Sequence, residues 1–357
     1  MSIPTEPIGS IPRPPELLAA FQDQQAGRIS AAEFDAIAAR ALHDTIRSLE
    51  QTGSAVITDG EQTKPSFATY PIAGLANLAP DGAVIPFADG HTRQLPRLTS
   101  GPFRYARHAS AYLVAAKRIT SFPVKQAVIS ASALSLLYPA SGIPGYSRDT
   151  FLSDLVVEAS TDIRQCLEQG ADTVQIDFTE ARLSLKLDPS GSLLEDFVAL
   201  NNRVLDQLTP AERERTGVHV CPGGDRDSTH SADVDYAGLL PALFRMRVSR
   251  FYLQLASESE PERVLRIVRE HLAHNPKVRV FVGVVDPIHP TVETPEQVCD
   301  RVLRAAEYLP VSQLGTTDDC GFSPFADDAS TSREIAFAKI RARVEGTRLA
   351  AEKLTGR

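Results

Sequence analysis

The sequence predicts an α/β fold of the TIM (β/α)8 barrel type. Eight short β-branched or apolar runs recur along the 357 residues, and stretches with helical spacing of Leu, Ala and Val lie between most of them. Eight regular strand and helix units fit a closed barrel better than an open sheet. With 43% hydrophobic residues the chain is long enough for one large or two ordinary domains, and we expect a single barrel domain over residues 1–357.

The predicted elements follow one another in a regular order. A long helical crossover, residues 13–49, follows the first strand, and helical patterns also cover 149–169, 194–208, 260–271 and a closing helix at 333–353. Residues 63–120, rich in Pro, Gly and Arg, read as an insertion between strands two and three. The eight predicted strands are 6–10, 55–59, 124–130, 173–177, 217–221, 250–255, 278–285 and 314–318.

Composition narrows the class of ligand and the cellular setting. A net charge of −8 argues against a broad nucleic-acid or anionic-membrane surface, so we expect a small-molecule ligand. The sequence has no apolar run long enough to span a bilayer, and its start lacks the pattern of a signal peptide, which predicts a cytoplasmic protein. The four cysteines do not resemble a disulfide framework, and we interpret Cys166 and Cys299, which lie in helical patterns, as packing residues.

The other two cysteines lie at strand ends. His219 and Cys221 are two residues apart on a predicted strand, so both face the same side and could bind one metal ion. Cys320 follows the last strand, 99 residues after Cys221, and only the fold could bring it to the same place. Buried packing is the alternative for both thiols, since free Cys is among the most buried residue types.

Polar residues stand at the end of each predicted strand, where the loops of a barrel converge on one mouth. A single Asp or Ser after a strand is more often a turn residue or a helix cap, but eight polar strand ends together favour a functional site. The candidates outside the metal motif are Ser10, Glu61, Asp177, Gln254 and Asp286.

These residues together resemble the cobalamin-independent methionine synthases, in particular short single-barrel proteins similar to their catalytic C-terminal half. The resemblance covers nearly the whole chain in order, and related barrels include epoxyalkane:coenzyme M transferase and uroporphyrinogen decarboxylase. The matching motifs are Ile8-Gly9-Ser10, Asp59-Gly60-Glu61, Val174-Gln175-Ile176-Asp177, His219-Val220-Cys221 and Asp319-Cys320-Gly321.

The resemblance implies a Zn²⁺ ion held by His219, Cys221 and Cys320, with a fourth position open to a substrate thiol. A metal-bound thiol is deprotonated at neutral pH and is therefore a ready nucleophile. The resemblance further implies that Ser10 and Glu61, with Asp177, hold the charged ends of an amino-acid thiol such as homocysteine.

Three departures from the family pattern concern single residues. Gln254 stands where the family has a zinc-associated glutamate, which leaves a three-residue site, a substitute among Glu258, Asp318 and Asp319, or no bound zinc. The chain contains no Trp, and Tyr138 lies about where the family has its folate-stacking tryptophan. In strand seven the family histidine is displaced by one position to His289, so Asp286 is the better candidate for proton delivery and, with Asp177, a candidate catalytic carboxylate.

Three functions therefore remain open. The first is zinc-dependent transfer of a methyl or similar group to a thiol, with a methylated folate or another donor. The second uses the same zinc thiolate on an epoxide or other electrophile, and the third is a metal-free small-molecule-binding barrel with a decayed site. A homodimer or a partner protein that carries the methyl group is compatible with all of these features.

Overall fold

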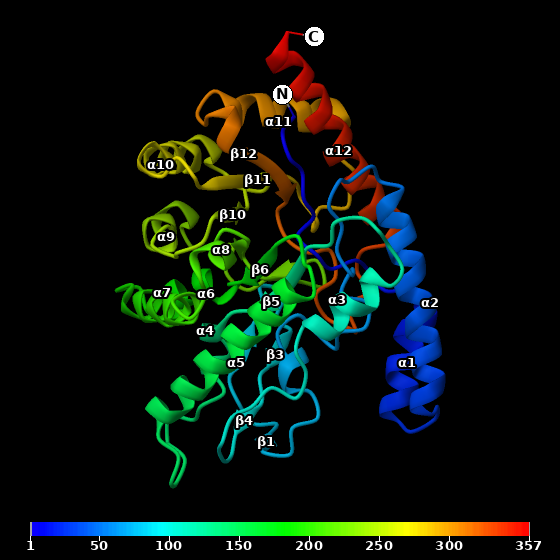
Figure 1. The fold of residues 1–357 in the computed structure, drawn as a ribbon, viewed down its shortest axis with the longest axis vertical. Coiled ribbons are helices and arrows are strands. Elements are labelled where there is room, and N and C mark those ends of the chain that lie inside the picture. Colours follow the sequence, from blue (N-terminus) through cyan, green and yellow to red (C-terminus); the bar gives the residue numbers. More distant parts are fainter. Residues whose placement is uncertain (1, 357) are drawn as a thin grey trace.

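The computed structural model describes residues 2–356, and a six-stranded parallel sheet forms its centre (Figure 1). Neighbouring strands follow the order β12-β11-β10-β7-β6-β5. Each of these strands overlaps a predicted one. Their bounds are β5 Gln126–Ile129, β6 Val174–Asp177, β7 Thr216–Val220, β10 Arg250–Leu253, β11 Arg279–Val285 and β12 Leu314–Asp318.

The two predicted strands before β5 are reduced to single bridges at the two edges of this sheet. Thr5 forms a parallel bridge with Thr316 of β12, and Ile57 forms one with Val124 beside β5. Prolines at positions 4 and 7 remove backbone donors from the first segment, which prevents a longer ladder. The hydroxyl of Thr58 donates to the Gly9 carbonyl at 2.9 Å, so the two edge segments also contact each other. The arrangement is that of the predicted barrel, with six regular strands and two bridged segments.

The predicted crossover over 13–49 is a helical hairpin, α1 Pro15–Gln25 and α2 Ala31–Glu50. Gly27, at φ 69°, permits the turn, and Ser30 starts α2 with a capping box. The hairpin has a small hydrophobic cluster of its own, separate from the main core, and Figure 1 shows it beside the barrel at the lower right. That cluster contains Leu17, Ala20, Phe34, Ala38 and Ala41.

Helices cover the outside of the sheet. The predicted helical patterns correspond to α5, α7, α10 and α12, and Cys166 and Cys299 are buried on α5 and α11, as packing residues would be. Among residues 2–356, no helix is both long and apolar enough to cross a membrane. The bounds are α4 Ala131–Ser135, α5 Arg148–Glu168, α6 Glu180–Leu187, α7 Ser192–Leu205, α8 Pro210–Arg213, α9 Tyr236–Leu243, α10 Pro261–His274, α11 Pro295–Ala306, η2 Val311–Gln313 and α12 Arg333–Thr355.

Residues 63–120 form short elements beside the barrel mouth. Two antiparallel pairs, β1 with β4 and β2 with β3, precede α3. The turn after β2 docks on the loop that follows β7, where Ala88 N donates to Thr229 O at 2.9 Å. The bounds are η1 Tyr70–Ile72, β1 Leu78–Ala79, β2 Val84–Pro86, β3 Thr92–Gln94, β4 Arg97–Leu98 and α3 Ser110–Lys117, with β8 Gly224–Asp225 and β9 Ser228–Thr229 in the docked loop.

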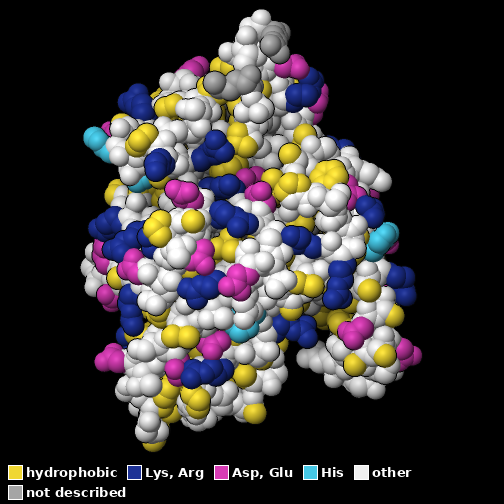
Figure 2. Space-filling model, in the orientation of Figure 1, with side chains coloured by type: hydrophobic (Ala, Val, Ile, Leu, Met, Phe, Trp, Pro, Cys, Tyr) yellow, Lys and Arg dark blue, Asp and Glu magenta, His cyan; other side chains and the backbone are white. Residues whose placement is uncertain are grey.

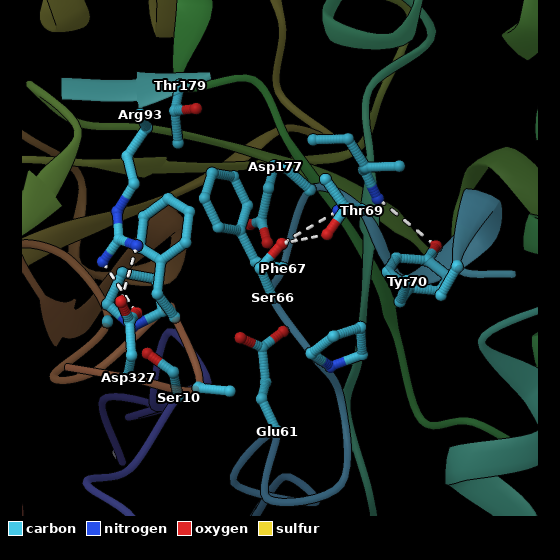
Figure 3. A pocket seen from close by; sticks show the side chains of 18 of the residues that line it. Ser10, Glu61, Ser66, Phe67, Thr69, Tyr70, Arg93, Asp177, Thr179 and Asp327 are labelled. Atoms are coloured by element: carbon cyan, nitrogen blue, oxygen red, sulfur yellow. Dashed lines mark hydrogen bonds and ion pairs between the residues drawn. The ribbon is translucent and has the colours of Figure 1, made fainter. Parts of the chain in front are cut away.

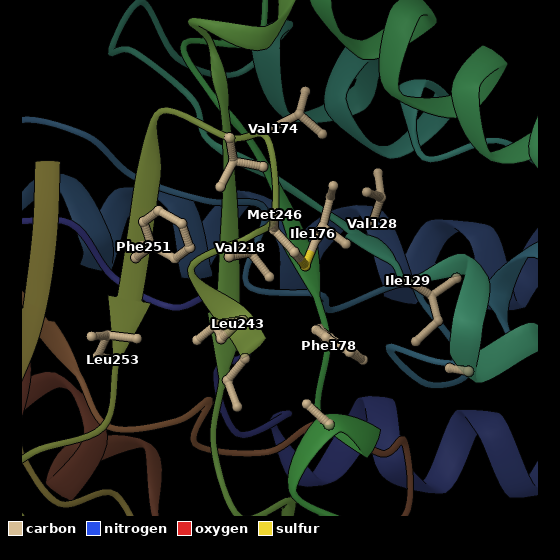
Figure 4. Close-up of a cluster of buried hydrophobic side chains, with 14 of the residues drawn as sticks. Val128, Ile129, Val174, Ile176, Phe178, Val218, Leu243, Met246, Phe251 and Leu253 are labelled. Carbon is tan, nitrogen blue, oxygen red and sulfur yellow. The ribbon is translucent and has the colours of Figure 1, made fainter. Parts of the chain in front are cut away.

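The main hydrophobic core lies between the sheet and its covering helices. Val128, Ile176 and Val218 project from three adjacent strands into this core (Figure 4). Leu243, the last residue of α9, and Met246, which comes just after the helix, belong to the same cluster. Packing of these apolar side chains against the helices fixes the register of the strands, because a shift by one residue would turn the whole set to the opposite face of the sheet, into the barrel interior. The register in turn fixes which residues stand at the barrel mouth.

Candidate active site

The three predicted metal ligands converge. His219 lies on β7, Cys221 directly follows it, and Cys320 follows β12, with β10 and β11 between these strands in the sheet. Their ligand atoms all lie within 4.8 Å of one another, and the two sulfur atoms are 2.9 Å apart. All three side chains are buried. The barrel thus brings together residues that are 99 positions apart in the chain.

The bonding of His219 suits a metal ligand. Its Nδ1 lies 3.4 Å from the carbonyl oxygen of Tyr252, and its Nε2 is buried without a hydrogen-bond partner among the described residues. A proton on Nδ1 would leave the Nε2 lone pair free, and a buried acceptor without a partner is costly. A bound metal ion would satisfy it.

The two sulfurs suit zinc. A hydrogen bond from the Cys221 thiol holds the pKa of Cys320 well below its usual range, while burial raises the pKa of Cys221. Two cysteine sulfurs and one imidazole nitrogen are donors that zinc commonly binds. The residues present fit a zinc ion with an open fourth position.

Gln254 is not part of the ligand group. Its amide nitrogen donates to Ser257 Oγ at 2.9 Å and to Glu258 Oε1 at 2.7 Å. Glu258, named above as a possible substitute ligand, is only partly exposed, forms an ion pair with Arg182 at 3.0 Å and is outside the ligand group. Both side chains are engaged with each other and with Arg182.

The two aspartates before Cys320 also have other partners. Asp319 accepts hydrogen bonds from the backbone nitrogens of Leu255, Ala256 and Ser257, at 2.7–2.9 Å. Asp318 accepts one from Ile8 N at 3.3 Å. Within residues 2–356, the metal-ligating group thus contains no carboxylate. Asp319 instead ties the loop after β10 to the segment that carries Cys320.

A cavity of about 1040 Å³ opens beside the metal ligands. His219 and Cys320 line it together with Ser10, Glu61 and Asp177, and Figure 3 shows the last three around the same space. The cavity extends to the α1–α2 hairpin, and Figure 2 shows a hollow between this hairpin and the rest of the molecule, on a face where acidic and basic side chains are intermixed. The predicted substrate residues and two metal ligands therefore share one site.

Glu61 is held by a buried cation. It has φ 54°, and its Oε1 lies 2.9 Å from Lys64 Nζ, with both side chains almost fully buried. Lys64 also donates to Ala127 O at 3.0 Å and lies 4.8 Å from the centre of the Tyr70 ring. Lys64, which sequence reasoning did not single out, fixes the Glu61 carboxylate and offsets part of its charge.

Asp177 and Ser10 complete this part of the cavity. Burial raises the pKa of Asp177 to about 7, and Gln175 donates to its Oδ1 at 2.8 Å. Ser10 Oγ accepts a hydrogen bond from Ser323 N at 3.1 Å. A Cβ at Gly321 would lie 2.2 Å from Ser10 Oγ, so the glycine beside Cys320 is what leaves Ser10 its place.

Tyr138 and Asp286 lie outside the cavity, as does Gln254. The hydroxyl of Tyr138 donates to Tyr146 O at 2.7 Å, and its ring stacks on Phe151 with centroids 5.4 Å apart, so it does not line the cavity. Asp286 accepts hydrogen bonds from its own loop, from Ile288 N at 3.0 Å and His289 N at 3.4 Å. It lines a second cavity of about 400 Å³.

The sequence reasoning assigned no role to two further cavity residues, Arg93 and Glu180. Arg93, on β3 within residues 63–120, pairs with Asp225 and Asp327 and lies 4.1 Å from the centre of the Phe325 ring. Glu180 also lines the cavity, three positions after Asp177. A second acid one helical turn after a strand-end Asp was the available signal for Glu180, whereas nothing in the sequence links Arg93 to residues more than 130 positions away.

Comparisons with known proteins find related proteins that match nearly the whole chain. The family described as "Cobalamin-independent synthase, Catalytic domain" matches residues 3–345. A methionine synthase of Sulfurisphaera tokodaii is 22% identical, over 99% of this chain and 94% of its own length. A 5-methyltetrahydropteroyltriglutamate–homocysteine methyltransferase of Nitratidesulfovibrio vulgaris is 24% identical, over 96% of this chain and 42% of its own length.

Solved structures support the fold. The B12-independent methionine synthase of a Shewanella species, solved with selenomethionine, superposes with a TM-score of 0.76 at 19% identity, covering both chains completely. A putative vitamin-B12 independent methionine synthase of Listeria monocytogenes gives a TM-score of 0.71 at 22% identity, covering 98% of each chain.

Proposed function

We propose, from the premise that this chain belongs to the family of cobalamin-independent synthase catalytic domains, that it transfers a methyl group to the sulfur of a homocysteine-like thiol. The convergence of His219, Cys221 and Cys320 at the wall of a large cavity is the observation that carries the proposal. Relatives named methionine synthase, which match this chain over nearly their whole length, support the same reaction class.

These three residues would hold zinc, which when bound would keep a substrate thiol deprotonated at neutral pH. The unpartnered Nε2 of His219 and the paired sulfurs of Cys221 and Cys320 support this assignment. Tyr252 O orients the imidazole, and the Asp319 hydrogen bonds hold the segment that carries Cys320. The chain's part is therefore to keep three donors fixed beside the cavity.

The other cavity residues would orient the amino-acid end of the thiol. Glu61 and Asp177 offer carboxyl oxygens suited to an ammonium group, and the Ser10 hydroxyl is suited to a carboxylate. Lys64 keeps Glu61 in one place, so an incoming ammonium meets a preset acceptor rather than a mobile one. Ser10, Glu61 and Asp177 are all buried, and the low local dielectric strengthens these contacts.

Metal content tests the proposal first. We expect about one zinc per chain in the purified protein, loss of zinc in Cys221→Ser and Cys320→Ser, and retention in Cys299→Ser, a buried cysteine on α11 outside the site. Full zinc retention in both site variants would refute the metal assignment. Absence of zinc even after reconstitution would favour the metal-free small-molecule-binding barrel.

The methyl acceptor and donor are tested next. Homocysteine and methyltetrahydrofolate are the first pair to assay with the zinc-loaded protein, because they are the substrates that the family suggests. Methionine formation that is lost in Cys320→Ser would support the proposal. Zinc-dependent consumption of the thiol by an epoxide, with no methyl transfer from any methylated donor, would favour the second electrophile class instead.

A further inference from the structure

Glu180 is a buried carboxyl of the cavity to which the proposed reaction has so far assigned no role. It begins α6 directly after β6, three residues beyond Asp177, and only 4% of its surface is exposed. The cavity lining around it includes the apolar side chains Ile129, Leu136 and Leu183. A carboxyl in such surroundings is costly to ionise.

The hydrogen bonds of Glu180 are all on one oxygen. Ser130 Oγ donates to Oε1 at 2.5 Å, and Ser132 Oγ donates to the same atom. The two hydroxyls are held in turn, because Ala133 N donates to Ser130 Oγ at 3.1 Å and Asn201 Nδ2 donates to Ser132 Oγ at 2.7 Å. The other oxygen, Oε2, is buried and has no partner among the described residues.

This asymmetry locates the proton of the neutral acid. Burial, with a small contribution from the nearby Asp177, raises the pKa of Glu180 to about 7, and its two hydrogen-bond partners, Ser130 and Ser132, are uncharged. Since Oε1 already accepts two hydroxyl protons, the carboxyl proton belongs on Oε2. A buried O–H without an acceptor in the protein is suited to an acceptor on a ligand.

We propose that Glu180 is the general acid that protonates the leaving atom of the methyl donor. This inference rests on the proposed methyl transfer. In the transfer step a carbon–sulfur bond forms at the substrate thiolate and the bond between the methyl carbon and the donor nitrogen breaks. The electron pair of that bond stays on nitrogen, which takes the proton from Glu180 Oε2, and the resulting carboxylate regains a proton from solvent.

This role would fill the place that Asp286 was expected to take. Asp286 lines a separate cavity and accepts hydrogen bonds from its own loop, while Glu180 shares the main cavity with Asp177 and His219. An amine leaves poorly as an anion, so a donor with a methylated nitrogen requires an acid at this point. The main cavity, of about 1040 Å³, also has room for a methyl donor beside the thiol.

The first test does not depend on turnover. We expect the infrared spectrum at pH 6 to contain a carboxylic-acid C=O band that is absent from the Glu180→Gln variant, because Gln cannot carry the proton. A difference spectrum without this band would show that Glu180 is ionised and would overturn the inference, whatever the protein's reaction.

The second test compares two methyl donors in the zinc-loaded protein with homocysteine. Methyltetrahydrofolate must release an amine, whereas methyl iodide releases iodide and needs no proton. We expect Glu180→Gln to lower kcat about 100-fold or more with methyltetrahydrofolate, with a loss at least about tenfold smaller with methyl iodide. Equal losses with the two donors, or no transfer from methyltetrahydrofolate by the wild-type protein, would overturn proton delivery. Failure of the wild-type protein with both donors would instead reject the methyl transfer itself.

A third variant distinguishes acid catalysis from a structural role. Ser132→Ala removes one of the hydrogen bonds that lower the pKa of Glu180, so the decline of kcat with rising pH should move to higher pH. The same substitution made in Glu180→Gln should leave the pH profile where it was. A profile that stays fixed when Ser132 alone is changed would contradict the role of Glu180.

Discussion

Replacing Lys64 tests how the cavity holds the buried carboxylate of Glu61 in place. Lys64→Met keeps most of the side-chain volume but removes the ammonium, which lies 2.9 Å from Glu61 Oε1 and 3.0 Å from Ala127 O. Removal of one partner from a buried ion pair costs about 3 to 5 kcal/mol, because the other charge stays buried without compensation. Loss of the cation–π contact with Tyr70 adds about 0.5 to 2 kcal/mol.

The energetic consequence would be large on the scale of the whole fold. Since domains are stable by roughly 5 to 15 kcal/mol, we expect Lys64→Met to lower the free energy of unfolding by about a quarter or more. Urea titration followed by circular dichroism measures this change. The double variant with Glu61→Gln removes both charges and should regain about 2 kcal/mol or more relative to Lys64→Met alone.

A surface pair provides the control for this experiment. Arg348 contacts Glu345 and Glu352 on α12, and all three side chains are about half exposed, so Arg348→Met should change the urea midpoint little. If Lys64→Met were as mild as Arg348→Met, or if Glu61→Gln gave no recovery, the ion pair would not be what holds Glu61 in place. The preset ammonium acceptor in the proposed function would then lose its support.

Three further predictions concern the same site. The folded-state pKa of Glu180 is about 7 against an ordinary 4.5, so its protonation stabilises the fold fully below pH 4.5, and this contribution is lost as the pH rises through 7. Relative to Glu180→Gln, the wild-type free energy of unfolding should therefore fall by roughly 3 kcal/mol between pH 4 and pH 8. Parallel curves of the two proteins in urea titrations over this range would contradict the assigned pKa. Gly321→Ala places a methyl group 2.2 Å from Ser10 Oγ, so it should lower the free energy of unfolding by about 1 to 3 kcal/mol and weaken homocysteine binding measured by calorimetry. Gly9→Ala, whose methyl group would meet nothing within 4 Å, should have little effect on either quantity. Equal effects of the two substitutions would disprove the steric argument. Zinc chelation should lower the thermal midpoint of the wild-type protein and leave that of Cys221→Ser unchanged, and an equal drop in both proteins would mean that the chelator acts elsewhere.

Much of the fold could be predicted because it depends on local patterns. The six regular strands coincide with apolar β-branched runs, and α2 begins at Ser30, which with Glu33 is a typical helix start. That the first two barrel segments form only single bridges could not be predicted. A strand pattern in the sequence does not show how many backbone hydrogen bonds the segment forms with its neighbour. The prolines at positions 4 and 7 were the only local sign.

The site could be predicted in part. Strand alternation puts His219 and Cys221 on one face, the family resemblance adds Cys320, and the structure brings the three together. Tyr138 and Asp286 show the limit of this argument. Each has a polar atom that bonds within a few residues of its own position, and such local bonds turn a side chain away from a site in a manner that strand assignment cannot reveal.

The pairing of the chain's beginning with its end has a consequence for the order in which the protein is made. The segment around Ser10 bonds to Ser323, 313 residues later, and the last zinc-ligand candidate, Cys320, lies close to the end of the sequence. Contacts of such long separation form late in folding, because a long loop must close first. A growing chain on the ribosome would carry His219 and Cys221 for some time before Cys320 is made, so the proposed set of three metal donors is complete only after residue 320 has been synthesised.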